Sequence, residues 1–318
     1  MNKKNKVVVI GGGNGSATSI NALKQNIDNI ELSAVVTMSD STGSSGSLRQ
    51  EFNTLPAGDI LRAILAMSKY DYTLLKQIFY RNRFSGAGKL DKHDLGNIFL
   101  VLAEQYAGDW ISAVRALEQA VEAVGHVYPA SLMVSDLVAE LDNGDIIKTE
   151  GSIDRPEYDR NLRIKKLGLE PWVEASKEAI KVLTEADYII FGPGSFYTSV
   201  VATISPVGIK EAIEKSDAKL IQIVGNAYEG IGETGPTKLS DFVGELEMYL
   251  PRQIDKVVFN KTILNSTAQE KYKERKWIPI EFDMGEKEQD RIVSYNFEKE
   301  EGGLDPNKLG KILKEILV

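Results

Sequence analysis

The chain has 318 residues, of which 42% are hydrophobic and 26% charged, so it is long enough to bury a substantial core as one large or two small globular domains. Its 38 Lys and Arg against 46 Asp and Glu give a net charge of −8, which argues against a general nucleic-acid-binding protein. Cysteine is absent, which excludes disulfides and thiol catalysis. The apolar run Val7 to Ile10 is too short for a signal peptide, and none approaches the roughly eighteen residues of a membrane span, so we expect a cytoplasmic protein.

The first 38 residues have the pattern of a strand–helix–strand unit. Residues 6–13, KVVVIGGG, begin as a buried strand and end in a glycine turn. Residues 16–27 carry apolar side chains at helical spacing, and residues 30–38, IELSAVVTM, form a second apolar run. A right-handed crossover places the two strands side by side in a parallel sheet.

The rest of the chain continues this alternation. Helices are predicted over 55–70, 71–84, 93–106, 109–125, 174–186, 195–216 (interrupted near Pro206), 237–250 and 305–317. Strands are predicted over 187–194, 218–226 and 254–260, with a hairpin turning at Asn143-Gly144. The polar residues 149–166 indicate an exposed loop or an interface segment. Helices alternating with strands predict an α/β fold with a mostly parallel sheet.

Two glycine-rich turns share a chemistry that suits anions. The first consists of Gly11, Gly12, Gly13, Asn14 and Gly15. The second ends the strand at 187–194, and its candidate ligand-binding residues are Gly192, Pro193, Gly194, Ser195, Tyr197, Thr198 and Ser199. Glycine lets the backbone approach a ligand closely, and a helix N-terminus attracts phosphate or carboxylate. The competing interpretation of the first turn is a tight strand-to-helix connection without a ligand.

The first turn departs from the dinucleotide-binding pattern. Ser16 stands where that pattern has its third glycine, and the second strand does not end in an acidic residue, which disfavours an NAD(P) oxidoreductase. The sequence also contains no P-loop pattern and no His or Cys spacing typical of zinc sites.

The segment Ser39 to Phe52, SDSTGSSGSLRQEF, is predicted to be a loop that cradles an anion. Its small ligand-binding candidates are Ser41, Thr42, Gly43, Ser44 and Ser45. Asp40 is a candidate ligand of a divalent cation such as Mg²⁺ or a proton acceptor, and Arg49 is a candidate phosphate clamp. The competing interpretations are an Asx turn for Asp40 and a surface ion pair for Arg49.

Asn226, at the end of another strand, completes the set of turns. Because ligands bind at the carboxyl edge of a parallel sheet, we expect all of these turns to meet there in one polar pocket.

Residues on the nearby helices are further candidates. Asp59 can supply a second carboxylate or simply cap its helix. His93, beside Asn97, can assist proton transfer or cap the helix that it precedes. His126 follows Gly125 at a predicted helix end, where a structural role is favoured.

These segments, in this order, resemble the CofD/YvcK family. The resemblance rests on GGGNG, SDSTGSSGSLRQEF, HDLGN, GPGSFYTSV and GET, and spans roughly residues 6–240. It implies a Rossmann-like three-layer α/β fold and a single domain over 1–318, with a core at about 5–250 and a C-terminal extension at about 251–318. One branch of the family comprises Mg²⁺-dependent transferases that join a phospho-lactyl group to a deazaflavin. The other comprises gluconeogenesis factors, which bind nucleotide-sugars such as UDP-N-acetylglucosamine and act in carbon metabolism and cell shape.

The chain resembles the gluconeogenesis-factor branch more closely. Tyr272 matches a tyrosine associated with the nucleotide-sugar ligand. Ser41 stands where relatives carry a second carboxylate, and Gly303 where they carry a ligand-linked arginine. The leading hypothesis is therefore a nucleotide- or nucleotide-sugar-binding regulator. Because family members often self-associate, the resemblance also implies that the protein can form a homo-oligomer. The alternative is a Mg²⁺-dependent 2-phospho-L-lactate transferase, with Asp40, Asp59 and His93 as its catalytic residues and the two aspartates holding the metal. A purely structural interaction protein is the weakest hypothesis.

Overall fold

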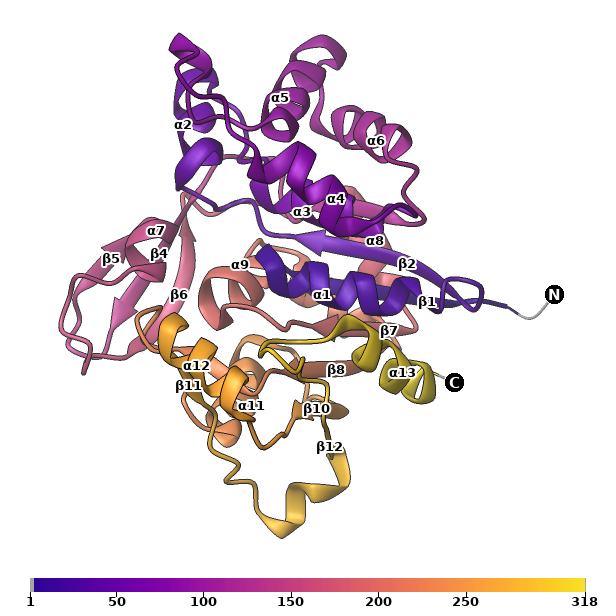
Figure 1. The fold of residues 1–318 in the computed structure, drawn as a ribbon, viewed down its shortest axis with the longest axis vertical. Helices are drawn as coiled ribbons and strands as arrows, with labels where there is room; N and C mark the ends of the chain where they lie inside the picture. Colours follow the sequence, from indigo (N-terminus) through magenta and orange to yellow (C-terminus); the bar gives the residue numbers. More distant parts are fainter. Residues whose placement is uncertain (1–2, 318) are drawn as a thin grey trace.

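A seven-stranded parallel sheet forms the centre of the computed structural model, which describes residues 3–317 (Figure 1). Its strands, in spatial order, are β12 (Ile292–Tyr295), β10 (Lys256–Asn260), β8 (Lys219–Val224), β7 (Tyr188–Phe191), β1 (Asn5–Gly11), β2 (Ile30–Val36) and β3 (His126–Pro129). The chain runs outward from β1 through β2 to β3, and then from β7 outward on the other side. The order therefore reverses between β1 and β7, which is where sheets of this type bind ligands.

Helices cover both faces of the sheet and make this a three-layer α/β fold. One face packs against α1 (Gly13–Lys24), α3 (Gly58–Met67), α5 (Leu95–Ala107), α6 (Trp110–Ala120) and α13 (Pro306–Ile316). The other packs against α8 (Lys177–Thr184), η3 (Phe196–Val201), α9 (Ala202–Ile204), α10 (Ile209–Lys215) and α11 (Leu239–Tyr249).

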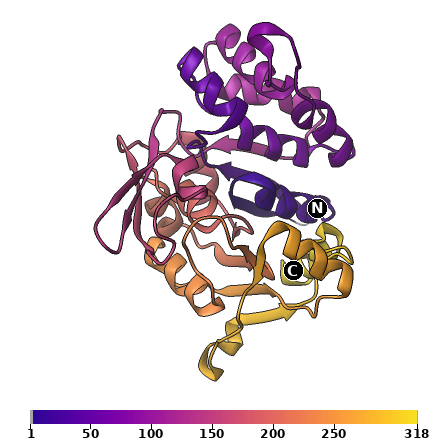
Figure 2. The ribbon, with the colours of Figure 1, turned by 60° about the vertical axis from the view of Figure 1, so that its left-hand side comes forward.

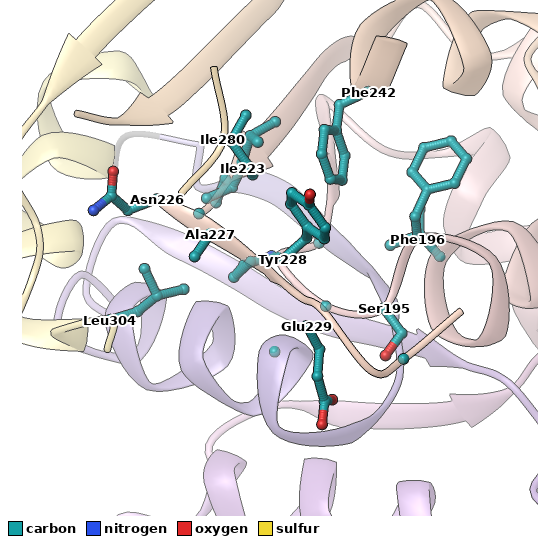
Figure 3. A pocket seen from close by; sticks show the side chains of 18 of the residues that line it. Ser195, Phe196, Ile223, Asn226, Ala227, Tyr228, Glu229, Phe242, Ile280 and Leu304 are labelled. Carbon is teal, nitrogen blue, oxygen red and sulfur yellow. The ribbon is translucent and has the colours of Figure 1, made fainter. Parts of the chain in front are cut away.

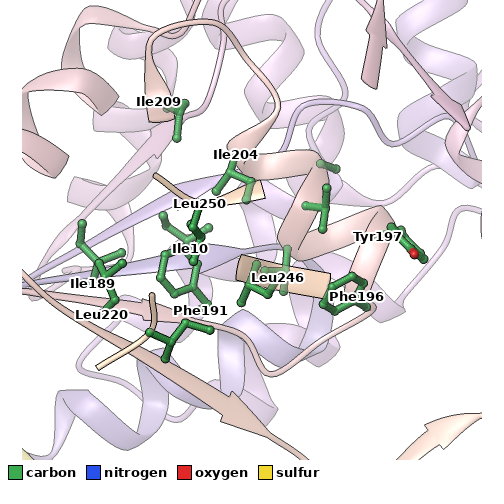
Figure 4. Packing of buried hydrophobic residues seen from close by; sticks show 14 of the residues in the cluster. Ile10, Ile189, Phe191, Phe196, Tyr197, Ile204, Ile209, Leu220, Leu246 and Leu250 are labelled. Carbon is green, nitrogen blue, oxygen red and sulfur yellow. The ribbon is translucent and has the colours of Figure 1, made fainter. Parts of the chain in front are cut away.

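The apolar runs of the strands follow from this double coverage. Val7 and Val9 of β1 belong to one core, whereas Val8 and Ile10 belong to the other. Figure 4 shows the second core, where Ile10 lies close to Phe191. A strand buried on both faces needs apolar residues at every position, which is why no alternation is visible in its sequence.

Two small sheets complete the fold. The antiparallel sheet β5-β4-β6 consists of β4 (Asp136–Leu141), β5 (Ile146–Lys148) and β6 (Ile164–Glu170), and β9 (Ala227–Glu229) pairs with β11 (Trp277–Pro279). The three-stranded sheet lies on the opposite side of the molecule from both termini (Figure 1), and its hairpin projects from the body (Figure 2). The short helix α7 (Glu150–Asp154) follows this hairpin.

The C-terminal residues are part of the same body. β10 and β12 extend the central sheet, and α13 packs against α1 so closely that a Cβ at Gly310 would lie 2.7 Å from the carbonyl oxygen of Ala22. Further elements are α12 (Ser266–Arg275) and the 3₁₀ turns η2 (Gly88–Leu90) and η4 (Glu286–Arg291).

The strand–helix–strand start, the hairpin at Asn143-Gly144 and the mostly parallel sheet are confirmed. The loop predicted at 39–52 is wrong, since Gly43–Phe52 forms helix α2. Residues 149–166 contain α7 and the start of β6, and the helix predicted at 71–84 is a short α4 (Tyr72–Lys76) followed by a π-helical turn, η1 (Gln77–Arg81). His126 begins β3 rather than ending a helix. No helix within residues 3–317 has the length and apolar character that a membrane crossing requires.

Candidate functional site

Two adjoining cavities open at the carboxyl edge of the sheet, beside the point where the strand order reverses. We call the first the polar cavity; it has a volume of about 410 Å³ and is lined mainly by glycine, hydroxyl and charged residues. We call the second the aromatic cavity; it has a volume of about 340 Å³ (Figure 3). The residues lining both are Asn14, Gly15, Asp154, Gly194, Ser195 and Glu229. The two cavities are therefore compartments of one cleft.

The two glycine turns pack directly against each other to form the floor of this cleft. A Cβ added to Gly15 would collide with the backbone carbonyl of Pro193. Ser19 of α1 also donates a hydrogen bond to the carbonyl of Gly192 over 2.7 Å. Only glycine at position 15 allows this approach, so the turn after β1 positions the turn after β7.

Two helices begin at the polar cavity. α1 has Gly12 as its N-cap, which has no side chain to cap the helix, and the side chain of Thr42, the N-cap of α2, accepts no bond from the amides of α2. The first amide groups of a helix have no partner inside it, and together with the helix dipole they attract anions. Asn97 also lines this cavity, and its buried Oδ1 atom has no hydrogen-bond partner among the described residues. A ligand can satisfy these groups.

The turn after β7 differs because the protein itself fills its anion site. The Glu233 carboxylate accepts hydrogen bonds from the backbone amides of Tyr197 and Thr198, each over 2.9 Å. Burial raises the pKa of Glu233 to about 7, although these amides act in the opposite direction. The Tyr197 hydroxyl points into the core, where it donates to the carbonyl of Ile164. The expectation that these two amides bind a ligand is therefore corrected.

Carboxylates crowd the wall of the polar cavity. Asp40, Asp59, Glu150 and Asp154 all line it. Burial, followed by the charge of Asp59, raises the pKa of Asp40. Burial, followed by the charge of Asp40, raises the pKa of Glu150 to about 8, and its buried Oε2 atom has no partner in the described part of the chain. A cation entering here would relieve the repulsion between these groups.

Three arginines balance part of this charge. Arg62 pairs with Asp59 on the same helix, Arg83 pairs with Asp94 over 2.5 Å, and Arg155 pairs with Glu229 over 3.0 Å. Arg62 and Arg83 also stack on the ring of Tyr80, at 5.0 and 5.2 Å from its centroid. The π-helical turn η1 supplies that ring and brings these cations to the cavity.

The donor set suits a Mg²⁺ ion bound in part by phosphate. Residues 3–317 contain no group of three or more His, Cys, Asp or Glu side chains arranged to hold a metal. Mg²⁺ does not need such a cage, since it is commonly held by one or two carboxylates, water and substrate phosphates. Asp40 and Asp59, which line the polar cavity, are the two carboxylates that would hold such an ion. One oxygen of Asp40 already accepts from the Thr42 amide in an Asx turn, so its other oxygen remains for a ligand.

Tyr272 lies in a polar network at one end of the aromatic cavity. Its hydroxyl donates to Glu298 over 2.8 Å and accepts from Asn226 over 3.4 Å. Burial and the bond to Glu298 raise the pKa of Tyr272. The apolar and aromatic wall includes Trp277. Its other main members are Phe196, Ile223, Tyr228, Phe242, Ile280 and Leu304 (Figure 3).

The structure brings most predicted residues to the cleft, but not all of them. Those predicted but absent from both cavity walls are Gly11, Ser41, His93, Arg49 and Tyr197. Arg49 pairs with Asp136 over 2.9 Å and donates to the carbonyl of Ser135, so the surface ion pair is its observed role. His93 lies one residue behind the wall, with Nδ1 2.9 Å from the Ser44 hydroxyl.

Several lining residues were missed. They include Arg62, Tyr80, Arg83, Glu150, Asp154, Arg155, Tyr228, Glu229, Trp277 and Glu298. The sequence could have predicted Arg62 as a lining residue, because it stands one helical turn after Asp59 and therefore lies on the same helix face.

Comparison with known proteins identifies the family. The model of 2-phospho-L-lactate transferase CofD matches residues 7–297, so the chain belongs to the CofD family, as its motifs indicated. A putative gluconeogenesis factor of Thermotoga maritima is 38% identical over 84% of this chain and 82% of its own. The gluconeogenesis factor of Bacillus subtilis is 33% identical over 93% of each. A Bacillus halodurans crystal structure described as a member of the UPF0052 family is 28% identical, with a TM-score of 0.87 over 99% of this chain and 100% of its own.

Proposed function

We propose that the chain binds a nucleotide or nucleotide-sugar, such as a UDP-sugar, together with Mg²⁺, and regulates carbon metabolism and cell-wall or cell-shape processes. The observation that carries this proposal is the junction of a polar cavity, suited to phosphates, with a cavity walled by aromatic rings. The names of the relatives, gluconeogenesis factors, support the regulatory role.

The polar cavity would hold the diphosphate and its metal ion. The N-termini of α1 and α2 and the arginines favour phosphate oxygens. Five carboxylates (Asp40, Asp59, Glu150, Asp154 and Glu229) nevertheless outnumber three arginines (Arg62, Arg83 and Arg155) on its wall. A diphosphate alone would add negative charge to an already negative wall. Mg²⁺ would remove this conflict: Asp40 and Asp59 would hold the ion, and its positive charge would offset that of the phosphates.

The aromatic cavity would hold the nucleobase or the sugar. Rings such as those of Tyr228 and Trp277 offer stacking surfaces, and Asn226 and Tyr272 offer hydrogen bonds. The residues shared by both cavities would then surround the bond between the diphosphate and the group in the aromatic cavity.

Calorimetric titration with UDP-sugars, UDP, GDP and NAD(P), each with and without Mg²⁺, tests the proposal. We expect UDP-sugars to bind only with Mg²⁺, and Asp59→Asn to weaken binding by at least about tenfold, the equivalent of one lost charge-assisted contact. Asp136→Asn, which removes a carboxylate outside both cavities, should bind normally. A flat response to every nucleotide would overturn the proposal.

A Mg²⁺-dependent 2-phospho-L-lactate transferase is the second candidate. The paired carboxylates Asp40 and Asp59 and the name of the matching family model support it. The test is incubation with guanylyl-phospho-lactate, a deazaflavin acceptor and Mg²⁺, followed by mass spectrometry. Absence of product at high enzyme concentration removes this candidate.

A further inference from the structure

We propose that Ser44 and His93 form a nucleophile–base pair that accepts a phosphoryl group from a phosphoric anhydride in the polar cavity. This rests on the proposed function for its substrate class but adds a covalent step to it. The Ser44 hydroxyl lies 2.9 Å from His93 Nδ1, within hydrogen-bond reach. Ser44 lines the cavity and His93 does not, so the base lies behind the nucleophile.

Both partners are held in place by their surroundings. Their side chains are buried, with 8% of Ser44 and 7% of His93 exposed. His93 donates its backbone N–H to the carbonyl of Leu90 and accepts at its own carbonyl from Phe84. The next residue, Asp94, caps α5 by accepting from the amide of Asn97 over 2.8 Å. A base fixed in this way meets the nucleophile without first losing conformational entropy.

A neighbouring serine shows what a purely structural hydroxyl does on the same helix. Ser47 is exposed and donates to the carbonyl of Gly43, one turn earlier in α2. Ser44 instead directs its side chain across to a different segment, 49 residues away in the chain. This difference distinguishes an activatable hydroxyl from one that satisfies only its own helix.

The environment suits attack on phosphorus. Ser44 is the second residue of α2, whose first amides face the cavity and can stabilise charge on phosphate oxygens. The unpartnered Oδ1 atom of Asn97 lines the same wall and can accept a hydrogen bond from a ligand hydroxyl or bound water. Arg62 adds positive charge from the next helix.

The step conserves atoms and charge. The Ser44 proton passes to His93 Nδ1 as Oγ bonds to phosphorus. The bond between phosphorus and the bridging oxygen of the anhydride breaks, and its electron pair leaves with the departing phosphate. That phosphate departs as an anion, and His93, which lies behind Ser44, keeps the proton as an imidazolium. The products are Ser44 carrying the phosphoryl group and a free phosphate or nucleoside phosphate.

A fluorophosphonate probe tests the pair directly, because its phosphorus reacts with activated hydroxyls and releases fluoride. We expect intact-mass spectrometry to find one label per chain, and peptide mapping to locate it on Ser44. Labelling should disappear in Ser44→Ala and slow about 100-fold in His93→Gln, the usual contribution of a general base. Ser47→Ala and His126→Gln are matched controls and should label at the normal rate.

The outcomes separate this inference from the proposed function. The probe needs no nucleotide, so labelling of Ser44 supports the pair even if every UDP-sugar fails to bind. Conversely, nucleotide binding with no label on Ser44 would overturn the pair alone. Melting curves of each variant show whether a loss of labelling reflects misfolding, and mapping of the unmodified sequence decides the site without any variant.

Discussion

The turn after β1 and the turn after β7 both lead from a buried strand through glycines into a helix, yet they present different groups to the cleft. The first leaves the N-terminus of α1 facing the polar cavity with glycine as its N-cap. The second has its leading amides occupied by the Glu233 carboxylate. The same local chemistry therefore produces one helix N-terminus that stays open to the cavity and one whose leading amides the protein itself occupies.

This difference is decided by residues far from the turns. Glu233 lies more than thirty positions beyond the amides that it caps, on the segment after β8. The N-terminus of a helix attracts negative charge, but the tertiary structure decides whether a side chain or a ligand supplies that charge. Three substitutions test the contrast between the turns, and a fourth tests the polar cavity beside them.

Gly15→Ala should have the largest effect, because it breaks the contact that joins the two turns. The new methyl group would collide with backbone at Pro193, which cannot move aside as a flexible side chain can. We expect the free energy of unfolding to fall by about 3 kcal/mol, the upper range for overpacking. Urea denaturation measures this change. An unfolding midpoint equal to that of the unmodified chain would show that the turns are not in rigid contact.

Glu233→Ala should convert the second turn into a vacant anion site. It leaves the amides of Tyr197 and Thr198 without their acceptor, at an expected loss of about 2 kcal/mol. Inorganic phosphate should then raise the melting temperature of the variant more than that of the unmodified chain. Glu233→Gln keeps one acceptor oxygen and should lose less. If phosphate raised the melting temperatures of the variant and of the unmodified chain equally, Glu233 would not be what keeps anions from this turn.

How much of this site the sequence predicts depends on the separation of the residues involved. The β1–α1–β2 unit and the meeting of the turns at one edge follow from apolar runs and from the geometry of parallel sheets. The hydrogen bonds between Glu233 and the turn at Tyr197 cannot be predicted from the sequence around either residue. Glu150 lies in a segment noted only for its polarity, and nothing in the pattern around Trp277 marks that ring as part of a cavity, so their arrival at the cleft depends on tertiary packing.

Helix α2 was predicted as a loop for a related reason. Its serines and glycines are poor helix formers, and composition alone favours a loop. The segment is nevertheless helical because Leu48 is buried and because Gly46 approaches the backbone of Ser41 so closely that a Cβ would not fit. Packing overrode propensity in this helix, which lines the polar cavity.

Glu150→Gln should change how stability depends on pH on the polar side of the cleft. The pKa of Glu150 is about 8 in the folded chain and near 4.3 in the unfolded chain, so the folded state binds the proton more tightly. The contribution of Glu150 to the free energy of unfolding is therefore complete below about pH 4 and is lost as the pH rises through 8. Relative to the unmodified chain, the variant should therefore gain about 1.5 kcal/mol between pH 5 and pH 9, after allowance for solvent screening.

Melting curves without and with Mg²⁺ measure this change. Mg²⁺ favours the ionised carboxylates, so it should reduce the advantage of the variant at pH 9. An advantage that does not depend on pH would contradict the assignment of the raised pKa to Glu150, because a neutral side chain would then replace a group that does not titrate in this range.

Gly13→Ala should have the smallest effect and is the matched control for Gly15→Ala. Gly13 has a φ of +61°, so a side chain there costs about 1 kcal/mol of backbone strain. Its Cβ would meet only the Ser199 hydroxyl, at 3.9 Å, so no clash adds to that cost. The variant should keep the contact between the turns while placing a methyl group at the start of α1. Weaker nucleotide binding with nearly normal stability would then locate the phosphate at the first turn, whereas unchanged binding would move it towards α2.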